Sequence, residues 1–162
     1  MIIQSENILL RLTTNEDEEI KNMVENVEEL FSMSETRLYP QGIPKEMQFR
    51  IEKDGELIGD LRLIKIRWFN RKAELSIILK KEFHGQHYGE EAMRSIIKYA
   101  FEKMNLHRLE AEVIEYNKVS IALVEKLGFK LEGTLREGKF NEGKFWNIFR
   151  FGLLVDEYKE LK

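Results

Sequence analysis

Two glycines and two histidines separate a short apolar segment from a long amphipathic one, a spacing typical of a phosphate-binding loop. Residues 73–79 carry the leucines and isoleucines of a strand, and apolar side chains recur at helical spacing after Gly89. Glycines let backbone N–H groups turn toward a ligand, and the start of a helix adds unpaired donors with partial positive charge. Residues 84–89 (HGQHYG) therefore indicate a diphosphate site, although an ordinary tight turn into a helix also fits the pattern.

A second polar segment follows another predicted strand. Residues 109–113 alternate apolar and acidic side chains, and a helix is predicted from Asn117 through Leu127. Gly128 is suited to end this helix because glycine adopts the left-handed conformation readily. A strand therefore gives way to a helix here as well.

Together the two segments resemble the acetyl-CoA binding motifs of the GNAT superfamily of N-acyltransferases. Residues 84–89 are similar to the loop Gln/Arg-x-x-Gly-x-Gly/Ala of that superfamily. Residues 117–129 (NKVSIALVEKLGF) are similar to its Asn-x-x-Ala/Ser motif, which ends in Lys-Leu-Gly-Phe. Residues 132–136 followed by Gly143 resemble the branch that contains spermidine acetyltransferases and ribosomal-protein N-terminal acetyltransferases. The resemblance covers roughly residues 9–158.

The resemblance also implies which residues act. A backbone N–H near Leu79 would meet the developing oxyanion, and Glu74 would serve as the substrate-side base, through water or by holding the cation; a solvated strand-end glutamate is the alternative. Ser120 would donate a proton to the leaving thiolate or only hydrogen-bond the cofactor or the helix backbone. The residues expected to bind acetyl-CoA are Ile77, Ile78, Leu79, His84, Gly85, Gln86, His87, Tyr88, Gly89, Asn117, Ser120 and Lys126.

Three residues depart from the family pattern. His84 stands where Gln or Arg is usual, and His87 replaces a glycine, which a β-carbon permits only if the backbone avoids positive φ. For both histidines we favour loop or phosphate contact over catalysis. Val124 replaces a tyrosine that protonates the thiolate in many relatives, with Tyr116 as a nearby phenol. Because a thiol has a pKa near ~8.5, we expect slower transfer rather than none. A non-catalytic acyl-CoA-binding or sensing module is the alternative function.

The remaining sequence predicts the elements that position these motifs. Strands are predicted at residues 2–12, 47–52, 56–67, 73–79, 109–113, 129–136 and 145–154. Helices are predicted from Glu16, after Gly89 and from Asn117. A loop is predicted between Pro40 and Pro44, tight turns at Asp54-Gly55 and Glu142-Gly143, and a polar tail at residues 156–162. This order predicts an α/β (α+β) fold. We expect a GNAT-like mixed, mostly antiparallel sheet of six or seven strands, splayed open beside the thioester, with helices on both faces.

Composition limits the classes of function. A chain of 162 residues is the size of one domain, and we expect a single N-acetyltransferase domain over residues 1–162. The 26 basic and 29 acidic residues lack the basic excess of a nucleic-acid-binding protein, so no nucleic acid partner is expected. The absence of cysteine excludes disulfides and thiolate chemistry, and we expect no metal. Apolar stretches fall far short of the ~20 residues that cross a membrane, which favours a cytoplasmic protein without a membrane partner.

An acidic segment indicates the kind of amine that accepts the acetyl group. Residues 15–35 contain eight carboxylates and one lysine, a local charge of −7. In the superfamily this region forms the acceptor wall, which would concentrate a cationic substrate; a solvated helix face is the alternative. We expect a small-molecule or peptide amine acceptor, with a polyamine or small cationic amine favoured over a protein N-terminus. The resemblance also allows a homodimer formed through sheet edges.

Overall fold

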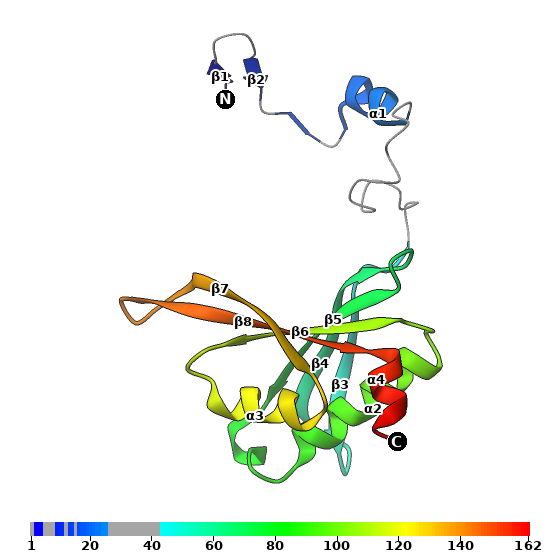
Figure 1. Cartoon of the computed structure of the whole chain (residues 1–162), viewed down its shortest axis with the longest axis vertical. Coiled ribbons are helices and arrows are strands. Elements are labelled where there is room, and N and C mark those ends of the chain that lie inside the picture. The colour runs from blue at the N-terminus through cyan, green and yellow to red at the C-terminus, as the bar shows by residue number, and fades with distance from the viewer. Residues whose placement is uncertain (1, 5–8, 12, 15, 26–42) are drawn as a thin grey trace. The chain divides into compact units, whose positions relative to one another are not determined.

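The computed structural model describes residues 2–4, 9–11, 13–14, 16–25 and 43–162 (Figure 1). The chain divides into two compact units, residues 1–41 and 42–162. In the first unit, β1 (Ile2–Gln4) pairs antiparallel with β2 (Leu9–Arg11), and α1 (Glu18–Glu25) follows. The single strand predicted for residues 2–12 is wrong, because two short strands pair with each other there.

The start of α1 shows why a helix forms here. The Asp17 carboxylate accepts the backbone N–H of Ile20 at 3.2 Å, and the Thr13 hydroxyl donates to the same carboxylate at 2.8 Å. Such a side-chain acceptor satisfies one of the unpaired N–H groups at a helix start. The predicted continuation of this helix and most of the predicted proline loop lie outside the described residues.

The second unit is built on a six-stranded sheet in the order β3-β4-β5-β6-β8-β7 (Figure 1). The strands are β3 (Met47–Lys53), β4 (Glu56–Arg67), β5 (Lys72–Leu79), β6 (Arg108–Ile114), β7 (Lys130–Asn141) and β8 (Lys144–Leu154). All neighbours are antiparallel except β5 and β6, which run parallel. The predicted mixed, mostly antiparallel sheet is confirmed.

Two tight turns close the hairpins as the sequence predicts. Asp54 and Gly55 have φ of 51° and 80°, and Glu142 and Gly143 have φ of 50° and 74°. Two successive residues of positive φ match the right-handed twist of the flanking strands, which explains the glycine in each turn. The second hairpin is longer than predicted, because β7 continues to Asn141 instead of ending at Arg136.

Three helices pack on one face of this sheet: α2 (Tyr88–Glu102), α3 (Lys118–Lys126) and α4 (Val155–Glu160) (Figure 1). The predicted apolar stripe of α2 is confirmed, because its buried residues are Met93, Ile96, Ile97, Ala100 and Phe101. They join one core with residues of β4, β5, β6 and β8, and with the buried end of α3. None of the described helices is long and apolar enough to cross a lipid bilayer.

The predicted polar tail is wrong, because α4 occupies most of it. The backbone N–H of Leu154 donates to the Glu157 carboxylate at 2.9 Å, which caps this short helix. The Tyr158 ring packs on Phe101 of α2 with a centroid distance of 5.1 Å. The core contact explains why a mostly polar segment is helical. The expected helix on the opposite face of the sheet stays a prediction.

Candidate active site

The parallel strands β5 and β6 part halfway along their length. Their pairing runs from Lys72 with Arg108 to Leu75 with Ala111, whereas β5 continues to Leu79 and β6 to Ile114. We call residues 72–75 the paired half of β5 and residues 76–79 its open half. Beyond the last pair, β6 is paired with β8 on its other side. The splayed sheet implied by the family resemblance is therefore present.

The open half directs two of its residues toward the opening. The backbone N–H of Lys80 donates to the Ile58 carbonyl at 2.9 Å, at the end of the antiparallel ladder between β4 and β5. Such ladders alternate, so Ile78 directs its backbone groups toward β4. Ile77 and Leu79 direct theirs away from β4, toward the opening. Of the three predicted strand-edge residues, these two offer backbone groups there.

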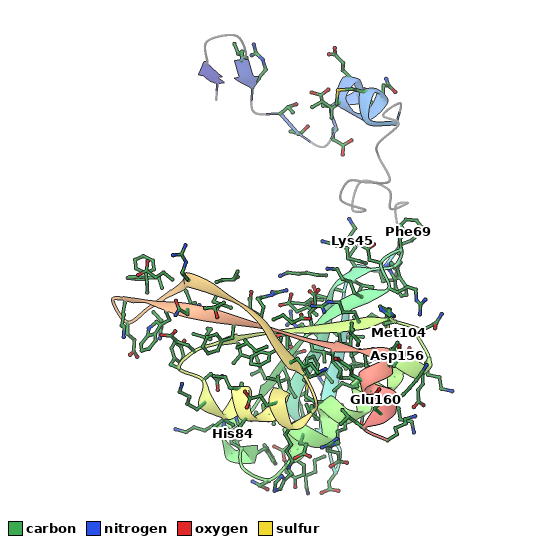
Figure 2. All side chains as sticks on the ribbon, in the orientation of Figure 1. Lys45, Phe69, His84, Met104, Asp156 and Glu160 are labelled. Atoms are coloured by element: carbon green, nitrogen blue, oxygen red, sulfur yellow. The ribbon has the colours of Figure 1, made fainter. Side chains whose placement is uncertain are left out.

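His84 is held against the end of this strand. Its ring Nε2 lies 2.9 Å from the Leu79 carbonyl oxygen, and because a carbonyl only accepts, the ring nitrogen donates. In Figure 2 His84 lies at the opposite end of the second unit from Lys45. This contact uses the Leu79 carbonyl and leaves the Leu79 N–H as its group toward the opening. The His84 ring thus contacts the end of the strand, and its expected contact with phosphate stays a prediction.

The loop that follows brings the start of α2 close to the strand end. Gly85 has φ of 73°, and the Gln86 side chain donates to the Glu82 carbonyl at 2.9 Å. The His87 side chain does not cap α2, and no side chain in the described part of the protein accepts an N–H of its first turn. A β-carbon on Gly89 would lie 3.3 Å from Leu79 Cδ1, a close approach that glycine permits. Backbone donors of the loop and the strand therefore gather in one region.

His87 does not meet the condition set for a side chain at its position. It precedes α2 with φ of 66°, in the left-handed region that a glycine would occupy without strain. Its ring Nδ1 lies 3.6 Å from Glu90 Oε2. The departure from the family glycine is therefore accommodated by a strained backbone.

Lys126 lies beside this loop through a contact with α2. Its Nζ is 2.7 Å from Glu90 Oε2, and Arg94 also donates to the Glu90 carboxylate, at 2.9 Å. The hydrogen bond from Lys126, followed by that from Arg94, lowers the pKa of Glu90 from 4.5 to about 2. The pair ties the last turn of α3 to the first turn of α2.

The expected cofactor-side residues in and before α3 have different surroundings. The Asn117 side chain accepts the N–H of Ser120 at 3.1 Å and so caps the helix. The Ser120 hydroxyl has no hydrogen-bond partner among the described residues. Val124 is 4% exposed and belongs to the core, which explains a valine at this position. Tyr116 packs edge-on against Trp146, with ring centroids 5.0 Å apart.

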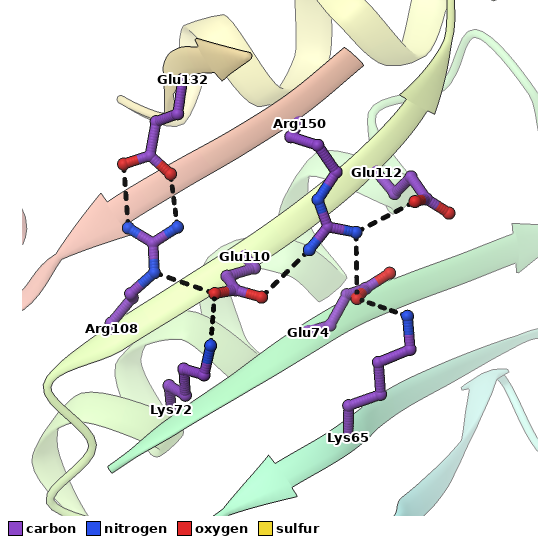
Figure 3. Close-up of polar contacts among 8 residues, drawn as sticks. All are labelled: Lys65, Lys72, Glu74, Arg108, Glu110, Glu112, Glu132 and Arg150. Atoms are coloured by element: carbon purple, nitrogen blue, oxygen red, sulfur yellow. Dashed lines mark hydrogen bonds and ion pairs between the residues drawn. The ribbon is translucent and has the colours of Figure 1, made fainter. Parts of the chain in front are cut away.

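Glu74 lies on the sheet face opposite the helices and is buried, with 4% exposure. Its Oε2 is 3.1 Å from Lys65 Nζ and 3.4 Å from a guanidinium nitrogen of Arg150 (Figure 3). The interpretation as a solvated strand-end glutamate is therefore wrong. Arg150 also contacts Glu110 and Glu112. The network continues to Lys72, Arg108 and Glu132.

The two oxygens of the Glu74 carboxylate differ. Both cations contact Oε2, and Oε1 makes no hydrogen bond to another described residue. A buried carboxylate oxygen without a partner is costly and is usually satisfied by water or a ligand. Glu74 can therefore accept a further donor without losing either ion pair.

A groove of about 620 Å³ lies beside Glu74, over β4 and β5. Ser76 and Ile78 of the open half line it on the same sheet face as Glu74, and Ile78 is 68% exposed. The other lining residues are Lys45, Glu46, Asp60, Arg62, Ile64, Lys65 and Arg67. Four cations and two carboxylates give this lining a positive balance. Among the described residues, no group of three or more metal-ligating side chains occurs.

Three residues of the site escape sequence reasoning. Arg150 reaches Glu74 from β8, 76 residues away in sequence. Glu90 is one of several acidic residues after the loop, and its ion pair with Lys126 of α3 joins residues 36 positions apart in sequence. Lys65 belongs to a basic run on β4, but a bulge between Ile64 and Arg67 changes its direction. Alternation in the sequence gives the facing of a regular strand and not that of a bulge.

The sequence profile described as Acetyltransferase (GNAT) domain matches residues 7–130. This match covers more than half of the chain, and together with the open sheet it shows that the chain belongs to the GNAT acetyltransferase family. The family resemblance of the two sequence motifs is confirmed.

The most similar proteins include spermidine acetyltransferases. The spermidine N(1)-acetyltransferase of Escherichia coli is 33% identical over 113 residues, which are 70% of this chain and 61% of that protein. The chain thus matches less than two thirds of this relative. A mutant form of the spermidine/spermine N-acetyltransferase SpeG from Vibrio cholerae gives a TM-score of 0.71 at 30% identity, over 75% of this chain and 74% of that chain. A dodecameric spermidine N-acetyltransferase from Vibrio cholerae gives 0.68 at 26% identity, over 87% and 89%.

Proposed function

We propose that this protein is an acetyl-CoA-dependent N-acetyltransferase that moves an acetyl group to a primary amine. A polyamine or another small cationic amine is favoured over a protein N-terminus. The observation that carries the proposal is the pair of backbone groups, on Ile77 and Leu79, that face the opening between β5 and β6. They lie near the glycine loop and the uncapped start of α2.

The residues at the opening fit acetyl-CoA, which supplies the acetyl thioester when bound. The open half of β5 offers backbone groups to an extended amide chain such as pantetheine. Gly85 and the first turn of α2 offer unpaired N–H groups to a diphosphate. Lys126 adds a cation beside that loop, and Asn117 positions α3 as its cap. Ile78 contributes its side chain to the groove rather than a backbone donor to the opening.

Acetyl transfer to an amine needs a base, a donor for the developing negative charge and a proton for the thiolate. An alkylammonium has a pKa near ~10, so Glu74 Oε1 would hold the cation or take its proton, directly or through water. The N–H of Leu79 would stabilise negative charge on the acetyl oxygen. The Ser120 hydroxyl, which lacks a partner among the described residues, would donate to the thiolate. Val124 has no proton to give.

The relatives and the charge of the chain support a cationic acceptor. Proteins named as spermidine acetyltransferases match at about one third identity, and residues 15–35 carry a charge of −7. One structural relative is described as dodecameric. For this chain, a homodimer and the absence of a metal cofactor stay predictions.

The test is release of free CoA, measured with a thiol reagent, from acetyl-CoA and a panel of amines. The wild-type protein should release CoA only when an amine is present. Glu74→Gln should lower kcat by about 100-fold, because proton transfer by a positioned group contributes about that much, while the Kd for acetyl-CoA stays unchanged. Glu112→Gln is the matched control, since Glu112 also contacts Arg150, at 2.9 Å, on the same face. Equal turnover in both variants would remove Glu74 from the mechanism.

The burial of Val124 favours one other function, a non-catalytic acyl-CoA-binding or sensing module. The position that carries a proton donor in many relatives is here part of the core. Tight acetyl-CoA binding without CoA release across the amine panel would support this function instead.

A further inference from the structure

Lys65 combines a strained backbone with an ion pair to the buried carboxylate. It has φ of 50°, a conformation that lysine rarely adopts. It lies in the β-bulge where β4 has one residue more than β5, between the pairs Ile64 with Glu74 and Arg67 with Lys72. A bulge redirects side chains and is often found beside a functional site. Here the bulge brings the Lys65 ammonium to Glu74.

The same ammonium stands where the groove meets Glu74. Lys65 lines the groove, and of the described lining residues it is the one that forms an ion pair with Glu74. Its side chain is 58% exposed, whereas Glu74 is almost fully buried. An amine that enters from the groove therefore passes the Lys65 ammonium before it reaches the carboxylate.

The two cations on Glu74 are held with different strength. Arg150 contacts Glu110 and Glu112 in addition to Glu74 and is mostly buried. Lys65 has its one ion pair with Glu74 among the described residues, and its own side chain is 58% exposed, so water can solvate the ammonium when it moves away. Arg150 therefore keeps Glu74 in place when Lys65 moves away.

We propose that Lys65 is a displaceable internal cation, which competes with the acceptor ammonium for the Glu74 carboxylate from its position on Oε2 and thereby sets the affinity for a cationic acceptor. The inference rests on the proposed function, because it assigns the acceptor position to Glu74. An incoming ammonium must displace Lys65 or share the carboxylate with it, and like charges at this distance repel. Lys65 is then a specificity-determining residue that weakens the binding of cationic amines.

Calorimetric titration of spermidine in the presence of CoA tests this inference without requiring turnover. Lys65→Met should lower the Kd for spermidine by about fivefold, the size expected for one partly exposed charge contact. Lys65→Arg should retain the wild-type Kd. Lys72→Met is the matched control, since Lys72 forms an ion pair with Glu110 at 3.1 Å on the same face and does not line the groove. Its Kd for spermidine should also match the wild type.

A second variant separates this role from a structural one. Lys65→Gly removes the ammonium and accepts positive φ without strain, so it should fold and also bind spermidine more tightly. An unchanged or higher Kd in Lys65→Met and Lys65→Gly would overturn the inference, as would the absence of spermidine binding in every variant. If the wild-type protein binds CoA and spermidine but releases no CoA from acetyl-CoA, the proposed function fails while the Kd comparison still decides the role of Lys65.

Discussion

In the paired half of β5, residues 72–75, the backbone pairs with strands on both sides. Lys72 and Glu74 of this half place charges on the sheet face opposite the helices. In the open half, residues 76–79, one row of backbone groups pairs with no strand of the described residues, and Ile78 is exposed. The paired half thus presents charged side chains, and the open half presents unpaired backbone groups. Under the proposed function, one strand would contact both the amine and the thioester, because β6 separates from β5 after Leu75.

The surroundings of the two halves show the reverse difference. The paired half is fixed by the ladders to β4 and β6. At the open half, the flanking helices α2 and α3 are joined by the ion pair between Glu90 and Lys126. The first arrangement uses backbone hydrogen bonds and the second uses side chains. The following predictions test this difference, from the largest effect to the smallest.

Proline at equivalent positions of the two halves should have opposite consequences. Ala73 and Leu79 both direct their N–H away from β4, and only Ala73 meets β6 there. Ala73→Pro should cost about 3 kcal/mol or more, because it removes a ladder bond in the middle of a sheet. Leu79→Pro should leave the chain folded and lower turnover by about 100-fold, the usual effect of losing one oxyanion donor. Circular dichroism during heating and CoA release measure the two effects.

Two results would contradict this contrast. A folded and stable Ala73→Pro protein would show that the paired half does not depend on its bond to β6. Normal turnover in Leu79→Pro would show that the backbone donor of the open half has no part in transfer.

Val124→Tyr tests whether a side chain of α3 at this position can donate a proton at the opening between β5 and β6. The variant restores the tyrosine of many relatives, but Val124 is buried in the core. A larger side chain in a packed core costs about 1–3 kcal/mol, so we expect a lower melting temperature and no gain in turnover. Val124→Ile is the smaller control. Faster CoA release with unchanged stability would show that this position faces the site.

The sequence predicts local elements well where one short pattern decides them. The helix α2 has a broad apolar stripe, and Asp54-Gly55 and Glu142-Gly143 supply the positive φ of tight turns. The helix α4 is not predictable in this way, because its packing of Tyr158 on Phe101 depends on distant residues. For the same reason the sequence does not separate β1 from β2, because that separation depends on the pairing of the two strands.

The candidate site is predictable in outline and not in its details. Glycines and family motifs locate the loop, but only the register with β4 shows that Leu79, and not Ile78, turns its N–H to the opening. The burial of Glu74 under Lys65 and Arg150 depends on a bulge and on a strand far along the chain. Helical spacing alone does not decide whether Val124 faces the core or a ligand.

His87→Gly tests whether the backbone of the loop before α2 is strained by a side chain at position 87. Glycine accepts φ of 66° without the strain that a β-carbon brings, so the variant should be more stable by about 1 kcal/mol. His87→Ala is the matched control, because it removes the imidazole and keeps the strain. Urea unfolding measures both. Equal stability of the two variants would show that the side chain, and not the backbone, determines the effect.

Glu90→Gln tests the ion pair that joins the helices at the open end. Lys126, and then Arg94, lowers the pKa of Glu90 in the folded protein from 4.5 to about 2. Because the folded-state pKa is below the unfolded one, the pair stabilises the fold above about pH 4.5, and this contribution is lost as pH falls toward about 2. Wild type should therefore exceed Glu90→Gln in urea midpoint at pH 7, and the two midpoints should converge near pH 2–3. Glu91→Gln, in the same turn and without an ion pair to another described residue, should not show this convergence. If the urea midpoints of wild type and Glu90→Gln still differ at low pH, packing rather than the charge on Glu90 joins α2 and α3. The two halves of β5 would then differ in geometry and not in how their surroundings are held.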